Sequence, residues 1–206
     1  MSPESAVSLS SLLCAFDECE LQDLLSTFSC RDESIANFLK RQAIEFEKAS
    51  KSRTYLFIDD QSDKEIAGFF SVAISNLYIP EVTTDGLPVS SINNRKKLDG
   101  YRGKRNGTVQ TNFPVYLIGQ IARNSKYPPA NLSGKTLLDS ATGVIQDAAQ
   151  LVGGRLMLVE CTKALVPFYE CHGFKRQNFH VDTDSFREEN LIQMIKPINN
   201  YVCSVR

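Results

Sequence analysis

Residues whose types and spacing could do chemistry are concentrated in two segments of the C-terminal half of the chain. The first segment is the loop from Pro129 to Thr136, which leads into an apolar stretch with helical spacing. The second is the run Phe168-Tyr-Glu-Cys-His-Gly-Phe174, which contains a phenol, a thiol and an imidazole. Both segments also allow a purely structural interpretation, so the elements that position them matter.

The loop from Pro129 to Thr136 suits phosphate binding if a helix begins directly after it. A helix N-terminus presents unpaired backbone N–H groups and a partial positive charge. Gly134 would let the backbone approach a ligand closely, and Ser133 fits an N-cap. An ordinary strand-to-helix turn would have the same composition, so the loop alone leaves both interpretations open.

Two common nucleotide-binding motifs do not fit this loop. Gly134-Lys-Thr136 matches the end of a P-loop, but the first glycine of that motif would fall at Pro129. Proline has no N–H to offer a phosphate and has a fixed φ. The acidic run at Asp59-Asp60, which resembles a Walker B strand, precedes the loop and does not follow it. No GxGxxG occurs, which argues against a Rossmann site.

Tyr169 is the residue of the second segment that is best suited to acid catalysis. A phenol with a pKa of about 10 can protonate a departing thiolate whose pKa is about 8.5–9. A core aromatic residue with its hydroxyl at the surface would explain Tyr169 equally well.

The hydrophobic pattern predicts alternating helices and strands around both segments. Before the phosphate loop, the pattern predicts a helix at Phe28–Ala49, capped by Asp32 or Ser34, a hairpin of strands Thr54–Ile58 and Glu65–Leu77, and a strand at Val115–Ile121. After the loop Asn124–Asn131, it predicts a helix at Ser133–Leu151 that ends at Gly153-Gly154, a strand at Arg155–Glu160, a short helix at Thr162–Cys171 that ends at His172-Gly173, and strands at Gln177–Val181 and Leu191–Ile195.

Tyr78–Asn112 has no regular pattern and is predicted to be a long insertion loop, with a short helix allowed at Ser90–Leu98. Residues 93–107 contain six Lys or Arg and one Asp. A solvated loop is one interpretation of this basic run, and contact with a polyanionic substrate such as tRNA is the other.

The order of strand, phosphate loop, helix, strand, short helix and FY-x-x-x-GF resembles the GNAT N-acetyltransferases. The resemblance covers about Phe28 to Ile195 and is strongest from Tyr116 to Phe174. It implies an α/β (α+β) fold, with a central mixed, mostly antiparallel sheet flanked by helices and a V-shaped splay between the two central strands. Residues 1–206 would form a single domain, with the insertion at 78–112 and the acetyl-CoA-binding half at 115–174.

The resemblance further implies acetyl-CoA as co-substrate and assigns residues to its parts. The strand before the loop would pair with the pantetheine arm, and the loop and first helical turn would bind the pyrophosphate. The implied acetyl-CoA-binding residues are Gln120, Ile121, Ala122, Arg123, Leu132, Ser133, Gly134, Lys135, Thr136, Thr162 and Phe168.

Three positions depart from the family pattern. The pyrophosphate loop of the family reads Q/R-x-x-G-x-G/A, and the marked positions here are Pro129, Leu132 and Gly134, of which only the last matches. At the start of the short helix this chain has Thr162, where many members have an asparagine. Backbone donors and the helix dipole would then do most of the phosphate binding.

In the implied reaction, a primary amine attacks the acetyl thioester directly and Tyr169 acts as general acid. Glu160 is the favoured base, and the remaining candidates are Glu170, Glu81, Asp85 and His172, of which His172 also fits a C-terminal helix cap. The acceptor would be a small-molecule or peptide amine. The alternatives are a toxin-like acetyltransferase that acts on aminoacyl-tRNA, and a catalytically silent protein that binds coenzyme A or a partner.

Composition narrows the class of protein further. A chain of 206 residues suits one domain, and 23 basic against 24 acidic residues give no global reason to expect nucleic-acid binding. The six cysteines show neither CxxC nor the Cys/His spacing of a zinc site, so no metal is expected. Without a secretory signal or an apolar stretch of ~20 residues, we expect a cytoplasmic protein with no membrane segment, either monomer or dimer.

Overall fold

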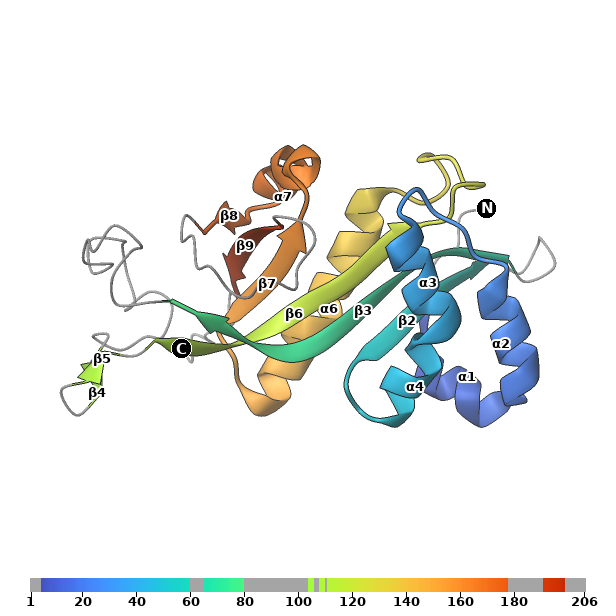
Figure 1. The fold of residues 1–206 in the computed structure, drawn as a ribbon, viewed down its shortest axis with the longest axis horizontal. Helices are drawn as coiled ribbons and strands as arrows, with labels where there is room; N and C mark the ends of the chain where they lie inside the picture. The colour runs from blue at the N-terminus through green and yellow to red at the C-terminus, as the bar shows by residue number, and fades with distance from the viewer. Residues whose placement is uncertain are drawn as a thin grey trace, which may run out of the picture. The chain divides into compact units, whose positions relative to one another are not determined.

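The computed structural model describes residues 5–59, 65–79, 104–105, 108–109, 111–177 and 191–198 (Figure 1). The first half of the chain contains β1 (Ala6–Ser8), α1 (Leu9–Ala15), α2 (Glu18–Ser26), α3 (Glu33–Arg41), α4 (Ala43–Lys48), β2 (Arg53–Asp59) and β3 (Glu65–Tyr78). The second half contains β4 (Lys104–Arg105), β5 (Thr108–Val109), β6 (Asn112–Arg123), α6 (Gly134–Val152), β7 (Leu156–Cys161), the 3-10 turn η2 (Lys163–Leu165), α7 (Val166–Cys171), β8 (Lys175–Arg176) and β9 (Ile192–Pro197).

Seven of the described strands form one mixed sheet in the order β1-β2-β3-β6-β7-β9-β8, and β4 pairs separately with β5. The pairs β1–β2, β2–β3, β7–β9 and β8–β9 are antiparallel. The predicted α/β class is therefore confirmed, as is the hairpin formed by β2 and β3. The V-shaped splay between the central strands stays a prediction.

The chain divides into two compact units: Met1–Ala73 with Ile118–Ile145, and Ile74–Leu117 with Gln146–Arg206. The first unit holds β1, α1 to α4, β2, the start of β3, the end of β6 and most of α6. The second holds the rest of β3 and β6, the end of α6, and β7 to β9 with α7. The single domain over 1–206 stays a prediction.

In the first unit, short polar residues begin the helices. The carboxylate of Asp32 accepts hydrogen bonds from the backbone N–H of Ser34 (2.9 Å) and Ile35 (3.4 Å), which makes Asp32 the N-cap of α3. The side chains of Ser8 and Asp17 cap α1 and α2 in the same way. The sequence pattern had not revealed these two N-terminal helices or β1.

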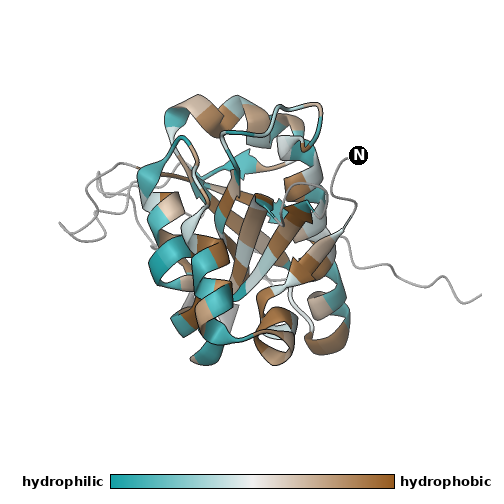
Figure 2. Ribbon diagram, turned by 90° about the vertical axis from the view of Figure 1, so that its right-hand side faces the viewer, coloured by the Kyte–Doolittle hydropathy of each residue, from teal (hydrophilic) through white to brown (hydrophobic). Residues whose placement is uncertain are grey.

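The predicted helix at Phe28–Ala49 is corrected in two respects. It begins at Glu33, because Asp32 is the cap, and it is interrupted at Gln42, whose φ of -121° is not helical. Phe28 precedes the helix and is fully buried, with its ring edge-on to Phe69 of β3 at 5.2 Å. Figure 2 shows that the strands are mostly hydrophobic, whereas the helices carry both hydrophilic and hydrophobic residues.

In the second unit, a buried core is formed by apolar residues of β3, β6, β7 and β9 and by Ile79, which follows β3. Its members are Leu77, Ile79, Phe113, Val115, Leu156, Leu158 and Ile195. The strand predicted at Val115–Ile121 is longer at both ends. Of the strand predicted at Gln177–Val181, only Gln177 is described, and it follows the end of β8 and belongs to no strand. Residues 178–181 and the helix allowed at Ser90–Leu98 lie outside the described residues.

Within the described ranges, none of the helices combines the length and apolar character that a bilayer span requires. The same part of the chain contains no group of three or more His, Cys, Asp or Glu side chains that could hold a metal ion. Five cysteines among the described residues are free thiols, namely Cys14, Cys19, Cys30, Cys161 and Cys171.

Candidate functional site

The loop predicted to bind phosphate lies in the first unit, between the end of β6 and the start of α6. Ser133 Oγ accepts a hydrogen bond from the backbone N–H of Thr136 at 3.0 Å, and its carbonyl accepts one from Leu137 at 3.2 Å. Ser133 is therefore the N-cap of α6, as predicted. The cap fixes where the helix dipole of α6 begins.

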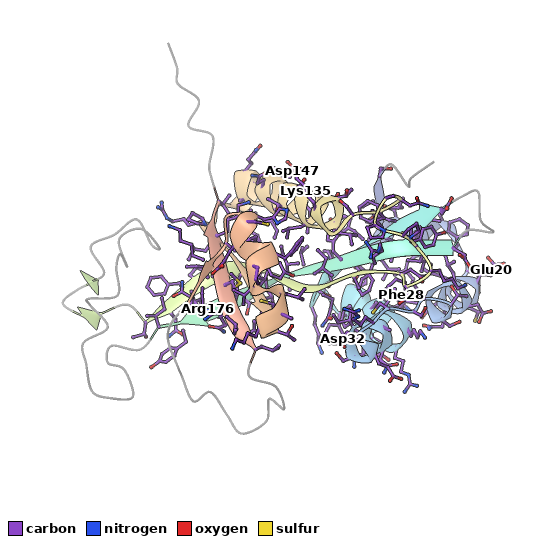
Figure 3. All side chains as sticks on the ribbon, turned by 90° about the horizontal axis from the view of Figure 1, so that it is seen from above. Glu20, Phe28, Asp32, Lys135, Asp147 and Arg176 are labelled. Carbon is purple, nitrogen blue, oxygen red and sulfur yellow. The ribbon has the colours of Figure 1, made fainter. Side chains whose placement is uncertain are left out.

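The cap also determines which backbone donors face outward at this helix end. The N–H of Thr136 is occupied by Ser133, whereas helix geometry leaves the N–H groups of Gly134 and Lys135 without an intrahelical acceptor. The Lys135 side chain, labelled in Figure 3 on α6, forms an exposed ion pair with Asp139 one turn further along. Of the predicted loop residues, Gly134 and Lys135 are thus best placed to offer backbone N–H groups.

A positive charge lies beside this helix start. Arg123, the last residue of β6, donates from Nη1 to the carbonyl of Leu132 at 3.2 Å. Leu132 is buried, and Gln120, Ile121 and Ala122 of β6 are half-buried. A guanidinium next to free helix N–H groups makes the local environment favourable for an anion.

Tyr169 lies in the second unit, on the buried side of α7. Val166 and Tyr169 are three residues apart, so they share one helix face, and Tyr169 is only 4% exposed. Its ring is edge-on to Phe168 at 5.1 Å and to Phe174 at 5.6 Å. The ring of Tyr169 is therefore held in place by the rings of Phe168 and Phe174.

The end of α7 is set by His172 and Gly173. Gly173 has a φ of +85°, and the N–H of Phe174 turns back to the carbonyl of Tyr169 at 3.1 Å. The imidazole Nδ1 of His172 lies 2.7 Å from the carbonyl of Phe168, which is the geometry of a helix cap. This contact favours the capping interpretation of His172 over that of a base.

Burial raises the pKa of Tyr169, and the nearby thiol of Cys161, when ionised, raises it further. The phenol therefore holds its proton at pH values where an exposed tyrosine would ionise. Cys161 is itself buried, and its thiol lies 3.6 Å from the sulfur of Met194. Sequence reasoning missed Cys161, because a cysteine at the end of a buried strand resembles an ordinary core residue.

Glu160 is half-buried on β7, where it pairs in register with Gln193 of β9. Gln193 Nε2 donates to Glu160 Oε1 at 2.9 Å, so the orientation of the carboxylate is fixed across the strand pair. No sequence signal marked Gln193. Among the other predicted bases, Glu170 is exposed on α7, and Glu81 and Asp85 lie outside the described residues.

The predicted residues fall into two sets. Gln120 to Arg123 and Leu132 to Thr136 belong to the first unit, whereas Glu160, Thr162, Phe168 and Tyr169 belong to the second. Thr162 has extended backbone geometry and directly precedes η2. The contacts seen within these sets join Arg123 to Leu132 and Ser133 to Thr136 in the first unit, and Phe168 to Tyr169 in the second.

No protein-family model matches the chain. Solved structures do share its fold over most of its length. A variant of the toxin KacT with one tyrosine replaced by phenylalanine is 17% identical, with a TM-score of 0.60 over 84% of this chain and 87% of that one. AtaTR bound with acetyl-CoA is 18% identical, with a TM-score of 0.59 over 84% and 86%. AtaT complexed with acetyl-methionyl-tRNAfMet is 17% identical, with a TM-score of 0.57 over 82% and 85%.

AtaT and KacT are acetyltransferases with the GNAT fold, and the chain shares that fold. The fold expected from the FY-x-x-x-GF segment and the order of elements is thereby confirmed. At these identities the similarity establishes the fold, and the chemistry has to be argued from the residues of this chain.

Proposed function

We propose that the chain is an acetyl-CoA-dependent N-acetyltransferase that transfers the acetyl group to a primary amine. The observation that carries this proposal is Tyr169, a buried phenol with a raised pKa at the FY position of a GNAT fold. A tyrosine that stays protonated in this position has a proton available for a leaving group held within hydrogen-bonding distance, although its raised pKa makes it a weaker acid than an exposed tyrosine.

The first unit fits the pyrophosphate of coenzyme A despite its incomplete motif. Gly134 and Lys135 offer N–H groups at the start of α6, and Arg123 adds a positive charge beside them. Arg123 and these backbone donors would offset the absence of the glycine that the family has at the position of Leu132. The predicted pairing of the pantetheine arm with residues 120–123 is part of the same proposal.

Acetyl-CoA supplies an activated thioester. The amine forms a C–N bond with the acetyl carbon, the C–S bond breaks, and Tyr169 transfers its proton to the departing sulfur. The amine gives up its own proton to Glu160, directly or through water. Gln193 holds Glu160 in a fixed orientation for that step.

A second candidate acceptor is the amino group of an aminoacyl-tRNA, which is also a primary amine. The complex of AtaT with acetyl-methionyl-tRNAfMet favours this candidate for a chain of the same fold. The basic run at 93–107 could contribute charge, although its side chains lie outside the described residues.

Free thiols at five positions suit a reduced, cytoplasmic location.

An acceptor screen tests the proposal. Release of the coenzyme A thiol from acetyl-CoA would be measured at low salt with three classes of acceptor: small amines, peptides with a free amino terminus, and bulk aminoacyl-tRNA. Release that depends on one acceptor class supports N-acetyl transfer and identifies the class. No release above the buffer rate with any class would contradict it.

The same assay separates an enzyme from a silent binding protein when it is combined with a thermal melt. A melting temperature raised by acetyl-CoA shows that the folded state binds the ligand. A raised melting temperature without acetyl transfer would favour the silent protein.

A further inference from the structure

The hairpin of β2 and β3 has a register irregularity in the first unit. Phe57 pairs with Gly68, but Ile58 pairs with Ile66, so Ala67 is an extra residue on β3. Such a β-bulge leaves backbone groups that need partners outside the strand pair. Buried carbonyls without partners are costly.

Asn124, the first residue after β6, supplies both of those partners. Its backbone N–H donates to the carbonyl of Ala67 at 2.8 Å, and its side-chain Nδ2 donates to the carbonyl of Ile66 at 2.9 Å. In a regular strand, successive carbonyls point to opposite edges of the strand. The bulge lets the successive carbonyls of Ile66 and Ala67 both accept hydrogen bonds from Asn124. Asn124 is 2% exposed, which keeps these hydrogen bonds away from water.

The same side chain shapes the loop that follows. Asn124 Oδ1 accepts a hydrogen bond from the N–H of Lys126 at 3.1 Å, and the backbone carbonyl accepts one from Tyr127 at 3.0 Å. These bonds form a turn of the Asx type. Asn124 must therefore donate and accept at once, which an amide does and an aspartate does not.

The far end of the loop is held against the same stretch of β3. A Cβ on Gly68 would lie 2.6 Å from a methyl carbon of Leu132 and 3.0 Å from the carbonyl of Ala122. Leu132 can pack this closely only because residue 68 is glycine. Since α6 begins two residues after Leu132, both ends of the loop depend on residues 66–68.

We propose that Asn124 is a positioning residue for the acetyl-CoA site. By fixing the loop 124–132 to the bulge of β3, it sets the place of the Gly134 and Lys135 N–H groups that would receive the pyrophosphate. This inference rests on the proposed function. Asn124 does not touch the ligand in this account, but its loss would move the groups that do.

The test compares Asn124→Ala and Asn124→Asp with Asn76→Ala and Asn76→Asp, which change an exposed asparagine of β3 outside the phosphate loop. Calorimetry on the full chain would measure the affinity for coenzyme A and for pantetheine, which lacks the pyrophosphate. We expect both Asn124 variants to lose about tenfold or more in coenzyme A affinity, since small misplacements of binding groups have large effects. The pantetheine affinity of the Asn124 variants should be unchanged, and both Asn76 variants should bind coenzyme A as the wild type does.

Gly68→Ala provides a second route if an Asn124 variant does not fold, because it disturbs the other end of the loop. It should also weaken coenzyme A binding. Pantetheine is not a control for this variant, because the added Cβ would lie 3.0 Å from the carbonyl of Ala122, in the strand proposed to pair with the pantetheine arm. Variants that melt earlier yet bind coenzyme A within twofold of the wild type would overturn the positioning role. A wild-type chain that binds no coenzyme A would instead overturn the proposed function itself, and the two failures are distinguishable.

Discussion

At the scale of single residues, the burial of Tyr169 determines what its phenol can do. Phe168 and Phe174 hold the ring, and the backbone turn at Gly173 fixes the end of the helix that carries it. A raised pKa keeps the proton on the oxygen and makes the phenol a weaker acid than an exposed tyrosine. A departing thiolate is a weaker base than a phenolate, so the proton transfer requires the sulfur to be held within hydrogen-bonding distance of the phenol.

Tyr169→Phe is expected to lower turnover by about 10- to 100-fold while acetyl-CoA still binds, because only the transferable proton is removed. Steady-state thiol release would give the turnover, and calorimetry would give the affinity. Tyr78→Phe, which changes an exposed tyrosine of β3, is the matched control and should leave turnover unchanged. Equal turnover in wild type and Tyr169→Phe would remove Tyr169 from the mechanism.

The raised pKa of Tyr169 also predicts how stability depends on pH. Above pH 10.0, the ordinary value for tyrosine, the unfolded phenol loses its proton while the folded one keeps it. The folded state then binds more protons, so the free energy of unfolding falls as the pH rises. Urea unfolding from pH 9 to 11 should show a smaller fall for Tyr169→Phe than for wild type. Identical slopes would mean that the phenol titrates normally when folded.

The sequence was sufficient to predict Ser133 as a helix cap, because the cap belongs to a local pattern. The FY pattern also marked Tyr169 as a candidate acid, and that role stays a prediction. Asn124 and Gln193 could not be predicted in this way. Their partners, Ile66 and Glu160, are 58 and 33 residues distant along the chain. Gly68 within an apolar strand was the one local hint of a close backbone approach.

At the scale of elements, α6 is central to the account because its N-terminus provides the proposed phosphate donors. Gly134 begins the helix and Gly143 lies in its middle, where an added Cβ would meet nothing within 4 Å. These two glycines of one helix allow the same substitution to be compared at a proposed binding position and at a neutral one.

Gly134→Asp should weaken acetyl-CoA binding by about tenfold, since a carboxylate would face the pyrophosphate at the helix N-terminus. An acidic residue in the first turn favours the helix itself, so the loss should not come from unfolding. Gly143→Asp is the control and should bind as wild type does. Calorimetric affinities that are equal for the two variants would contradict the phosphate site at α6.

Gly143→Ala should stabilise the protein by about 0.5–1 kcal/mol, because alanine costs less conformational entropy in a helix than glycine does. Gly154→Ala should destabilise it, since Gly154 has a φ of +128° and a Cβ there would lie 2.3 Å from the ring of Tyr116. Denaturant unfolding of both variants checks the contrast. Equal changes in the free energy of unfolding for the two variants would contradict the close approach of Gly154 to the ring of Tyr116.

Most elements near the site were predictable because their hydrophobic spacing is regular. The predicted helix boundaries were wrong where a tertiary contact had more influence than the local sequence pattern. Phe28 fits a helical pattern but is buried against Phe69, and α3 begins only at Glu33, five residues later, after the N-cap Asp32. The helix is interrupted at Gln42, where the sequence has no glycine or proline that would have predicted the interruption.

At the scale of the whole molecule, the chain keeps the GNAT fold at 16–18% identity to toxin structures such as those of AtaT and KacT. The parts with a clear sequence signal are the FY segment and the capped α6, whereas the pyrophosphate motif is reduced to Gly134. Binding of acetyl-CoA would therefore depend on backbone donors and on Arg123, and the proposed chemistry would depend on Tyr169.

Titration of acetyl-CoA into the full wild-type chain is the most direct test of that account. We predict saturable binding with one site per chain and a micromolar dissociation constant, roughly −8 kcal/mol in binding free energy. A chain that is folded, as judged by a cooperative melt, and yet gives no saturable heat with acetyl-CoA would contradict the central claim.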